Sequence, residues 1–430
     1  MRILLIGKGG REHALAWKLS QTAEHVYVVP GNGGTAMMGR KVTNVADVDM
    51  DDFEGLVKLA GELKIDLVVP GPDDVIVDGV ADVFGEAGIP CFAPSRAAAE
   101  LEGSKTYAKD FMQRHNIPTA EYRNFSDYSA ASAYLAEVKH RVVIKVSGLA
   151  AGKGVVLPET PEEAQEELRA IMVDGRFGAA GTEVVIEEFL TGDEISILTF
   201  SDGRTFKSLP PGQDHKRIFD GARGPNTGGM GVYGPTDFVS RAMMERIERE
   251  ILEPTFQGLR DEGRPFCGIL FTGVMVTPAG PKVLEYNVRF GDPETQSLVP
   301  LMAPNCDLAK LCLSCIDGSL EGQVLDVQDG YACNVIIAAE GYPGVYRQDD
   351  RIEMAPAFDR VHVFHAGTVL RDGELRTAGG RVFAVAAVRE TLVEAVEAAY
   401  KGVEGIKFPG MQFRRDIGAR GLIREARLGA

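Results

Sequence analysis

Short apolar runs alternate with amphipathic stretches through the first hundred residues of the chain. The apolar runs have the length of buried strands, and the stretches between them repeat at helical spacing. Strands are predicted at 2–6, 25–29, 67–70 and 90–93, and helices at 11–20 and 51–64. Strands and helices that alternate in this way predict a parallel sheet with helices on both faces.

Two of the predicted strands end in glycine turns, at 7–10 and at 71–74. Gly9 and Gly10 lead into a helix, so free backbone N–H groups and a positive helix end are expected at the carboxyl edge of the sheet. The strand at 25–29 ends without the acidic residue that holds the ribose of a dinucleotide. We therefore expect a smaller phosphate ester here, and a tight turn without a ligand is the alternative.

Residues 141–157 read as two apolar runs joined by a loop of glycines and small residues. The pattern predicts a hairpin whose loop carries Lys153 over phosphates, with Lys145 on the incoming strand aimed at them. The segment does not match a Walker A loop, because its glycine and lysine spacing differs and because a strand rather than a helix follows it. A flexible loop with an idle lysine is the alternative, against which Lys105 stands as a second candidate upstream.

The next pattern predicts a helix at 161–173 and a strand at 183–189. The exposed edge of that strand is expected to offer main-chain groups to an adenine between two small sheets. We interpret 123–193 as a small α+β lobe inserted into a larger one, with a hinge at 191–193.

A long tract at 210–234 is rich in glycine and polar side chains, among them Asp214 and Asn226. It exceeds an ordinary connection in length, which favours a functional segment over a disordered one. A helix at 241–262 and two strands at 269–276 and 282–288 are predicted to follow.

The last of these strands continues into 284–296, LEYNVRFGDPETQ. Strict alternation assigns Leu284, Tyr286 and Val288 to one face and Glu285, Asn287 and Arg289 to the other. Carboxylate and amide oxygens two residues apart suit Mg²⁺ shared with nucleotide phosphates, and a guanidinium beside them suits an anion. A half-exposed strand with a charged outer face is the alternative. Pro293 is expected to end the strand, and an apolar helix after residue 299 to reach residue 317.

From about residue 327 the pattern changes to short strands within 334–341, 361–368 and 380–388, followed by a helix at 391–403. A small β-rich unit is predicted there. His362 and His365 are three residues apart on one strand, so they are expected to face opposite sides. We interpret both as structural.

Composition narrows the possible partners. The chain is 45% hydrophobic and 25% charged, with a formal net charge of −16. That charge argues against nucleic acid or an anionic membrane as a partner and favours a small phosphorylated ligand. No apolar run approaches the roughly 20 residues that span a bilayer, and no signal peptide precedes the first strand, so a cytoplasmic location is expected. The six cysteines are interpreted as reduced thiols, with Cys312 and Cys315 in core packing rather than a zinc or redox site.

The order of nine motifs resembles the glycinamide ribonucleotide synthetase family, ATP-grasp enzymes of purine biosynthesis. The motifs are GGREHA, LEGSK, GLAAGKG, EEFL, QDHKR, GPNTGGMG, VLEYNVRFGDPETQ, AAEGYP and RRDIG, and they run from Met1 to about Gly418. The resemblance implies a mixed α/β and α+β multidomain fold. Its parts would be an N-terminal parallel α/β domain at 1–102, an ATP-grasp core at 103–122 and 194–326, an inserted lid lobe at 123–193 and a small C-terminal β-rich domain at 327–430.

The resemblance implies a ligase reaction in which ATP phosphorylates the carboxylate of glycine. The amine of 5-phosphoribosylamine then attacks the acyl phosphate to form an amide. Such a route needs positioning and charge neutralisation rather than a side-chain nucleophile. A paralogue that joins another amino acid to a phosphorylated amine, a non-catalytic nucleotide-binding protein and an ATP-grasp carboxylase are the alternatives, and GPNTGGMG argues against the last. A monomer or weak homodimer is expected.

The resemblance also implies roles by position. The metal, Mg²⁺ or Mn²⁺, would be held by Glu285 and Asn287. ATP would be bound by Lys105, Lys145, Gly152, Lys153, Gly154, Glu187, Glu188, Phe189, Leu190 and Glu194, of which 187–190 would take the adenine. Glycine and the ribosyl amine would be bound by Gly9, Gly10, Asp214, Asn226, Arg289, Asp292 and Glu294, with Arg289 and Asp292 as the catalytic pair.

Two further features bear on these roles. The glycines around Lys153 predict a lid whose closure over ATP gates turnover. The chain departs from the family's usual residues at five positions. It has Lys8 where the family usually has glycine or serine, Asp73 for glutamate, and Ser147 for an acidic residue. It has Gly212 and Gly234 where the family usually has serine. Lys8 lies in the expected phosphate turn and Ser147 at the entrance of the ATP loop, so the resemblance says less about substrate details there than about the metal strand.

Overall fold

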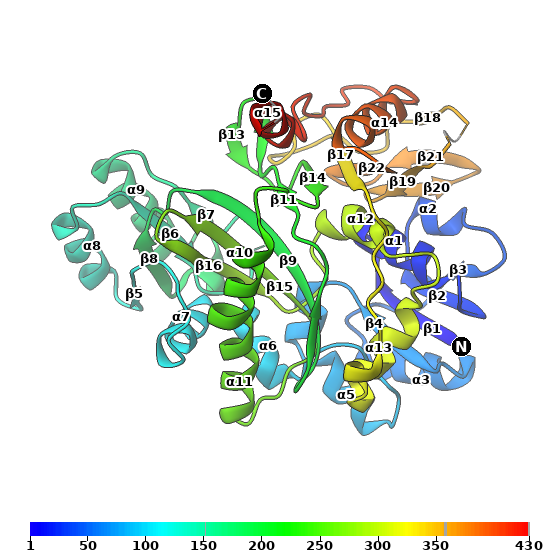
Figure 1. The fold of residues 1–430 in the computed structure, drawn as a ribbon, viewed down its shortest axis with the longest axis horizontal. Coiled ribbons are helices and arrows are strands. Elements are labelled where there is room, and N and C mark those ends of the chain that lie inside the picture. The colour runs from blue at the N-terminus through cyan, green and yellow to red at the C-terminus, as the bar shows by residue number, and fades with distance from the viewer. Residues whose placement is uncertain (151, 357–358, 429–430) are drawn as a thin grey trace.

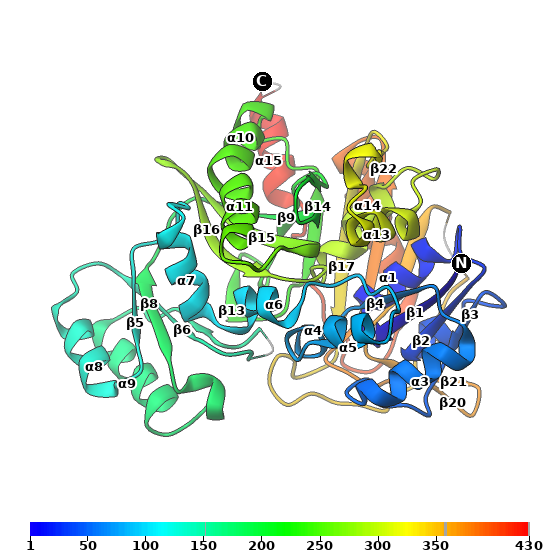
Figure 2. The same ribbon diagram turned by 90° about the horizontal axis from the view of Figure 1, so that it is seen from below.

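The computed structural model describes residues 1–150, 152–356 and 359–428, with side chains as far as Arg424. Figures 1 and 2 show the N-terminal and C-terminal sheets grouped at one end of the long axis, while the lid lobe projects at the other end beyond the core sheet.

The N-terminal part is a parallel sheet, as predicted, and its strands lie in the order β3-β2-β1-β4. Its elements are β1 (Arg2–Gly7), α1 (Gly10–Leu19), β2 (His25–Pro30), α2 (Gly33–Ala36), β3 (Val42–Asn44), α3 (Phe53–Leu63), β4 (Leu67–Pro70), α4 (Asp73–Val77), α5 (Val80–Glu86) and α6 (Arg96–Gly103). The strand predicted at 90–93 is wrong, because it makes only one parallel bridge, between Val68 and Cys91. Pro90 and Pro94 flank it, and proline has no N–H to extend a ladder.

The lid lobe has a sheet in the order β5-β8-β6-β7 and a hydrophobic cluster of its own. Its elements are β5 (Tyr122–Phe125), α8 (Tyr128–Glu137), β6 (Val142–Val146), β7 (Val155–Val156), α9 (Pro161–Met172) and β8 (Val184–Glu188). The predicted hairpin is confirmed, since β6 and β7 pair antiparallel. The predicted exposed edge is wrong, because β8 lies between β5 and β6.

The core sheet is antiparallel in the order β10-β9-β15-β16, and helices cover it. Its elements are α7 (Lys105–Arg114), β9 (Asp193–Asp202), β10 (Phe206–Ser208), α10 (Arg241–Ile247), α11 (Glu253–Asp261), β15 (Cys267–Thr277) and β16 (Gly280–Asn287). The helix predicted at 241–262 is present, but a π-helical segment at Glu248–Leu252 joins α10 to α11. Pro254 follows at once and cannot donate to the regular helical ladder.

Strand β16 departs from strict alternation by one residue. Gly273 pairs with Glu285 and Val274 pairs with Val283, so Leu284 forms a bulge. Val283, rather than Leu284, therefore joins Tyr286 and Val288 in the hydrophobic core. The prediction that Leu284 shares their face is wrong, whereas Glu285 and Asn287 are half-buried and stay outside the hydrophobic core that Tyr286 and Val288 enter.

The glycine-rich tract folds into short strands instead of one long loop. These are β11 (Gln213–Asp214), β12 (Arg217–Phe219), β13 (Arg223–Asn226) and β14 (Gly231–Gly234). Strands β11 and β14 extend the C-terminal sheet, whose order is β11-β14-β17-β22-β19. The tract that carries candidate site residues is thus hydrogen-bonded to the C-terminal part of the chain.

The remaining elements are two helices after the core sheet and then the strands and helices of the C-terminal part, from residue 331 onward. They are α12 (Glu294–Leu298), α13 (Leu308–Asp317), β17 (Tyr331–Ala338), β18 (Glu353–Met354), β19 (Val361–His365), β20 (Thr368–Arg371), β21 (Glu374–Thr377), β22 (Arg381–Arg389), α14 (Leu392–Glu404), β23 (Ile406–Lys407) and α15 (Ala419–Leu428). The apolar helix predicted after residue 299 is a 3₁₀ turn at Val299–Leu301 followed by α13, which starts late because Asp307 caps it.

The cysteines and histidines that were singled out pack in the interior. Cys312 and Cys315 are buried in an apolar cluster, which confirms core packing. His362 contacts the ring of Trp17 and His365 that of Phe383. Within the described residues no helix is both long and apolar enough to cross a membrane.

Candidate active site

The carboxylate of Glu187, at the end of β8, lies between two lysines where the lid lobe meets the core. Lys145 on β6 lies 2.5 Å from one carboxylate oxygen, and Lys109 on α7 pairs with the other. The three side chains are at most 6% exposed. Lys145 also donates to the carbonyl of Leu284 at 2.8 Å, so its ammonium is held against β16. Burial lowers the pKa of Lys109 to about 8 despite the carboxylate.

This network limits what 187–190 offer to a nucleotide. The carboxylate of Glu187 is occupied by the lysines, and Glu188 pairs with Lys282 at 2.6 Å. The N–H of Glu188 donates to the carbonyl of Glu121, and the N–H of Phe189 to that of Arg141. Adenine binding by 187–190 stays a prediction.

Glu285 on β16 faces a cluster of lysines. Its Oε1 lies 3.3 Å from Nζ of Lys216, which lies 2.7 Å from Glu194 at the start of β9. Lys216 lowers the pKa of Glu285 to about 2 against the effect of burial, and Lys145 and Lys105 contribute to the lowering. The carboxylate is therefore ionised at neutral pH, inside a patch whose lysines would attract phosphate oxygens.

Lys105 is the first residue of α7 and joins that helix to the lid hairpin. Its backbone N–H donates to the carbonyl of Ser147 at 2.9 Å. The Ser147 hydroxyl accepts the N–H of Thr106 at 3.3 Å and bonds to its Oγ1 at 2.9 Å. Ser147, where the family usually has an acidic residue, thus binds an otherwise unpaired N–H at the start of α7. Burial lowers the pKa of Lys105, although Glu285 opposes the shift.

Arg289 connects the predicted metal ligands to the N-terminal part. Its guanidinium donates to Oδ1 of Asn287 at 3.1 Å and lies 3.1 Å from Glu102. Glu102 is 5% exposed, and its other oxygen accepts the N–H of Val288 at 2.7 Å. The Nε of Arg289 is buried without a hydrogen-bond partner among the described residues. A firmly held guanidinium with one free donor is suited to bind a carboxylate or phosphate.

Two carboxylates, Asp214 on β11 and Glu294 at the start of α12, lie close together. We call the part of the site formed by Asp214, Asp292 and Glu294 the acceptor side, because glycine and the ribosyl amine are expected to bind there. Burial raises the pKa of Asp214 and Glu294 raises it further, while burial also raises the pKa of Glu294. Glu294 accepts from the Ser196 hydroxyl at 2.9 Å. A Cβ on Gly229, whose φ is +115°, would lie 2.9 Å from Oδ1 of Asp214. The pair would be stabilised by a cation placed between its members.

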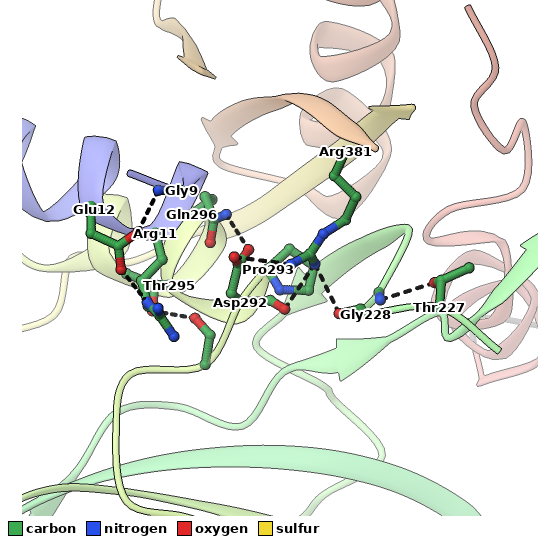
Figure 3. A network of polar contacts seen from close by, with 12 residues as sticks. Gly9, Arg11, Glu12, Thr227, Gly228, Asp292, Pro293, Thr295, Gln296 and Arg381 are labelled. Carbon is green, nitrogen blue, oxygen red and sulfur yellow. Dashed lines mark hydrogen bonds and ion pairs between the residues drawn. The ribbon is translucent and has the colours of Figure 1, made fainter. Parts of the chain in front are cut away.

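Asp292 is held by side chains on both of its oxygens (Figure 3). Arg381, the first residue of β22, lies 3.0 Å from Oδ2, and Nε2 of Gln296 donates to Oδ1 at 2.7 Å. Arg381 also donates to the carbonyls of Asp292 and Gly228, both at 2.9 Å. Although burial opposes ionisation, Arg381 and Arg11 lower the pKa of Asp292.

The N-terminal glycine turn lies beside Asp292 and Gln296. A Cβ on Gly9 would lie 3.6 Å from Oδ2 of Asp292, and one on Gly10 would lie 2.8 Å from Nε2 of Gln296. The N–H of Gly9 already donates to Glu12 at 2.6 Å. A phosphate at this N–H would have to displace the Glu12 carboxylate, so the phosphate role of Gly9 and Gly10 stays a prediction.

The lid loop reaches the turn after β13. A Cβ on Gly152, whose φ is +73°, would lie 3.8 Å from Cα of Gly228. Lys153 is exposed, and a Cβ on Gly154 would lie 2.4 Å from the Val146 side chain, which explains a glycine there. Asn226 ends β13 opposite Arg217.

The remaining departures from the family pattern have different surroundings. Lys8 is exposed, whereas Asp73 at the start of α4 lies near Arg289 and Arg11, which lower its pKa against the effect of burial. Gly212 and Gly234 face one another, since a Cβ on Gly234 would lie 3.3 Å from Cα of Gly212. A serine at either position would need the neighbours to move.

Sequence reasoning missed four residues that organise the site. Lys109 lies four residues after Lys105, a helical spacing that could have indicated it. Lys216 lies in the quoted QDHKR motif, but no role was predicted for it. Glu102 lies in the quoted LEGSK motif, but no role was predicted for it. Arg381 reaches the site only through tertiary contacts, so no local pattern marks it.

Three family models match the chain in order. The N domain of phosphoribosylglycinamide synthetase matches residues 1–102, its ATP-grasp (A) domain matches 103–295 and its C domain matches 332–420. The chain belongs to the phosphoribosylglycinamide synthetase family. The resemblance drawn from the motifs and the ATP-grasp fold class are therefore confirmed.

Named relatives and one solved structure agree with this assignment. A phosphoribosylamine–glycine ligase of Allochromatium vinosum is 47% identical over 430 residues, which are 99% of this chain and 100% of the relative. The bifunctional purine biosynthetic protein ADE1 of Schizosaccharomyces pombe is 51% identical over 97% of this chain, which spans only 53% of that relative. The crystal structure of a phosphoribosylamine–glycine ligase of Thermotoga maritima superimposes with a TM-score of 0.85, at 34% identity, over 97% of this chain and 100% of that one.

Proposed function

We propose that this member of the phosphoribosylglycinamide synthetase family is an ADP-forming ligase that joins glycine to 5-phosphoribosylamine. The products would be glycinamide ribonucleotide, ADP and phosphate, with glycyl phosphate as the intermediate. Bacterial relatives of nearly the same length as this chain bear the name of that activity. The chain spans about half the length of the fungal relatives, so their further activities do not enter the proposal.

One observation carries the proposal. A single segment, the end of β16 and the turn after it, has a candidate metal and phosphate face at Glu285 and a candidate amino-acid face at Glu294. Lysines surround the first face, and a firmly held arginine, Arg289, lies between the two. A ligase that activates a carboxylate with ATP needs these two sites side by side.

Glu285 and Asn287 fit a divalent cation. One supplies an ionised carboxylate and the other an amide oxygen, and both oxygens are met by cationic side chains, Lys216 and Arg289. The described residues contain no group of three or more His, Cys, Asp or Glu that could hold a metal. Mg²⁺ or Mn²⁺ here would take its other ligands from nucleotide phosphates and water, which suits Mg²⁺ in particular. When bound, the metal would neutralise phosphate charge.

Glycine would bind between Arg289 and the carboxylate pair. Its carboxylate would accept the free Nε–H of Arg289, and its ammonium would lie between Asp214 and Glu294. Burial raises the pKa of both carboxyl groups, and an ammonium between them would stabilise their ionised forms. A glycine carboxylate oxygen attacks the γ-phosphorus and the bond to ADP breaks. The ribosyl amine then attacks the carbonyl carbon, and the bond between that carbon and the phosphate oxygen breaks. The amine loses a proton, which the leaving phosphate takes up.

The lid would exclude water from the acyl phosphate. Lys145 is held against β16 by Glu187 and by the Leu284 carbonyl, so it lies where the lid sheet meets the metal strand. The loop after it approaches Gly228. We infer that closing this loop on ATP protects the intermediate from hydrolysis.

A substrate screen tests the proposal. ADP release is measured with ATP, Mg²⁺ and 5-phosphoribosylamine, together with glycine, alanine, serine or β-alanine. Release with glycine at least about tenfold above the others is expected, because one extra carbon on the substrate commonly changes transition-state binding by about that factor. Release with a different amino acid would favour the paralogous ligase, and no release in any mixture would favour a non-catalytic nucleotide-binding protein. We still predict that the protein is a monomer or a weak homodimer, and sedimentation would measure its oligomeric state.

A further inference from the structure

Arg381 brings a charged side chain from the C-terminal sheet into the candidate site. It follows two glycines, Gly379 and Gly380, and is the first residue of β22. Its side chain is 19% exposed. It lies far along the sequence from the residues it contacts, and it belongs to none of the roles that the motifs implied.

The guanidinium of Arg381 binds three acceptors in two separate segments. Nη1 donates to the carbonyl of Gly228 and to that of Asp292, each at 2.9 Å, and Nη2 lies 3.0 Å from the Asp292 carboxylate. One planar group therefore connects the turn after β13 to the turn after β16. A lysine could not reproduce this, because its ammonium is a single point charge on a flexible stem.

The turn after β13 is held from other sides as well. The N–H of Gly228 donates to the hydroxyl of Tyr342, which lies in the AAEGYP motif of the C-terminal part. The Thr227 hydroxyl donates to the carbonyl of Lys216 at 2.8 Å and accepts the N–H of Gly229 at 3.0 Å. Lys216 is the partner of Glu285, so the turn is linked to the metal side of the site as well.

The position of this turn decides the position of the acceptor residues. At Gly229 there is no room for a side chain, because a Cβ would lie 2.3 Å from Pro293 and 2.9 Å from Asp214. The turn thus lies between Asp214 and the segment that carries Asp292 and Glu294. If the turn moved outward, Asp214 and the segment with Asp292 and Glu294 would no longer both pack against it.

We propose that Arg381 is a positioning residue: it holds the 227–229 turn and Asp292 together, so that the C-terminal sheet completes the acceptor side of the site. The inference rests on the proposed function for its kinetic consequence. Its structural consequence, an ordered 227–229 turn, does not depend on which reaction the site performs.

The test compares R381M and R381K with R376M in the full-length chain. Arg376 on β21 is an arginine of the same part of the chain that binds Asp349 and Glu374 at a distance from the contacts above. For R381M we expect kcat to fall about 100-fold while KM for ATP changes less than about threefold, because misplacement of a reacting group by about 1 Å costs that much. R381K should recover less than about tenfold of the loss, and R376M should match the wild type.

Hydrogen exchange supplies the readout that does not depend on turnover. The amides of Gly228 and Gly229 should exchange at least about tenfold faster in R381M, while those of β1 and β15 stay protected. A D292N variant completes a cycle, and R381M together with D292N should be no slower than the worse single variant.

Three outcomes would overturn the proposal. If R381M kept the kcat of the wild type and the same protection of the Gly228 and Gly229 amides from exchange, Arg381 would have no positioning role. An increase confined to KM for 5-phosphoribosylamine would make Arg381 a direct ligand of that substrate. Additive losses in the cycle would separate Arg381 from Asp292. If the wild type itself releases no ADP, the proposed function fails, and the exchange experiment still decides the positioning claim.

Discussion

The acidic residues of the site differ in charge state because their neighbours differ. Glu285 has three lysines within electrostatic reach and stays ionised, whereas burial and a second carboxylate raise the pKa of Asp214. In the proposed function, the ionised carboxylate would hold a metal and the other would bind an ammonium group. Residue identity alone does not separate these roles.

Glu285→Gln should remove turnover while leaving the fold intact. The neutral amide loses the charge that a metal and its phosphates require, and Lys216 keeps Glu194 as its partner at 2.7 Å. We expect kcat to fall at least about 100-fold. The unfolding midpoint in urea should stay near that of the wild type, and E321Q, at an exposed position, is the matched control. Full activity in E285Q would contradict the metal assignment.

Glu187→Gln and Lys109→Met should differ sharply in stability. Glu187 neutralises two buried lysines, so its loss leaves two uncompensated charges and should cost about 3–5 kcal/mol. Lys109→Met removes one buried charge and leaves the Glu187–Lys145 pair complete, so the free energy of unfolding should change by less than about 1 kcal/mol. Urea unfolding at pH 7 measures both, and equal losses would contradict the shared-carboxylate interpretation.

At the level of elements, the sequence predicted most of what depends on local periodicity. Strands β1, β2 and β4 of the N-terminal sheet, the lid hairpin and strands β15 and β16 were placed near their observed bounds, whereas the three-residue β3 was not predicted. The errors lie where tertiary pairing decides. The bulge at Leu284 depends on the register with β15, and the interior position of β8 depends on β5. Lys105 and Glu285 could be selected from motifs, but the contacts of Arg381 could not.

Two histidines meet where α1 contacts β19, and we expect this contact to depend on pH. The backbone N–H of His365 donates to Nδ1 of His13 at 2.8 Å, and its ring faces Thr368. Burial lowers the pKa of His365 to about 4 and also lowers that of His13. The unfolded chain therefore takes up protons first, and this stability is present above about pH 6.5 and lost as the pH falls toward 4.

The corresponding prediction concerns His365→Gln. Between pH 7 and pH 5 the wild type should lose about 2 kcal/mol of unfolding free energy through this one histidine, and H365Q should not show that part of the loss. Urea unfolding at the two pH values measures it, with H140Q at an exposed position as the control. An identical pH dependence in H365Q and wild type would contradict a role for His365.

At the scale of the molecule, the lid lobe and the C-terminal part are attached in different ways. The lid lobe has a hydrophobic cluster of its own, and its two ends lie together, since Tyr122 pairs with Glu187. The C-terminal part shares its sheet with β11 and β14, and Tyr233 on β14 is a member of its core. The lid lobe is therefore a separately packed unit, whereas the C-terminal part is continuous with the site through β11 and β14.

Two deletions separate these attachments. Replacing 123–186 by a short glycine joint between Tyr122 and Glu187 should give a folded protein without activity, because the remaining cores stay complete and Lys145 is lost. Ending the chain at residue 326 should give a protein that precipitates or unfolds without cooperativity, because β14 loses β17 and Tyr233 loses its core. Solubility and the cooperativity of urea unfolding measure both. A soluble, cooperatively folded 1–326 chain would show that the shared sheet is dispensable and would weaken the case that the C-terminal part completes the site.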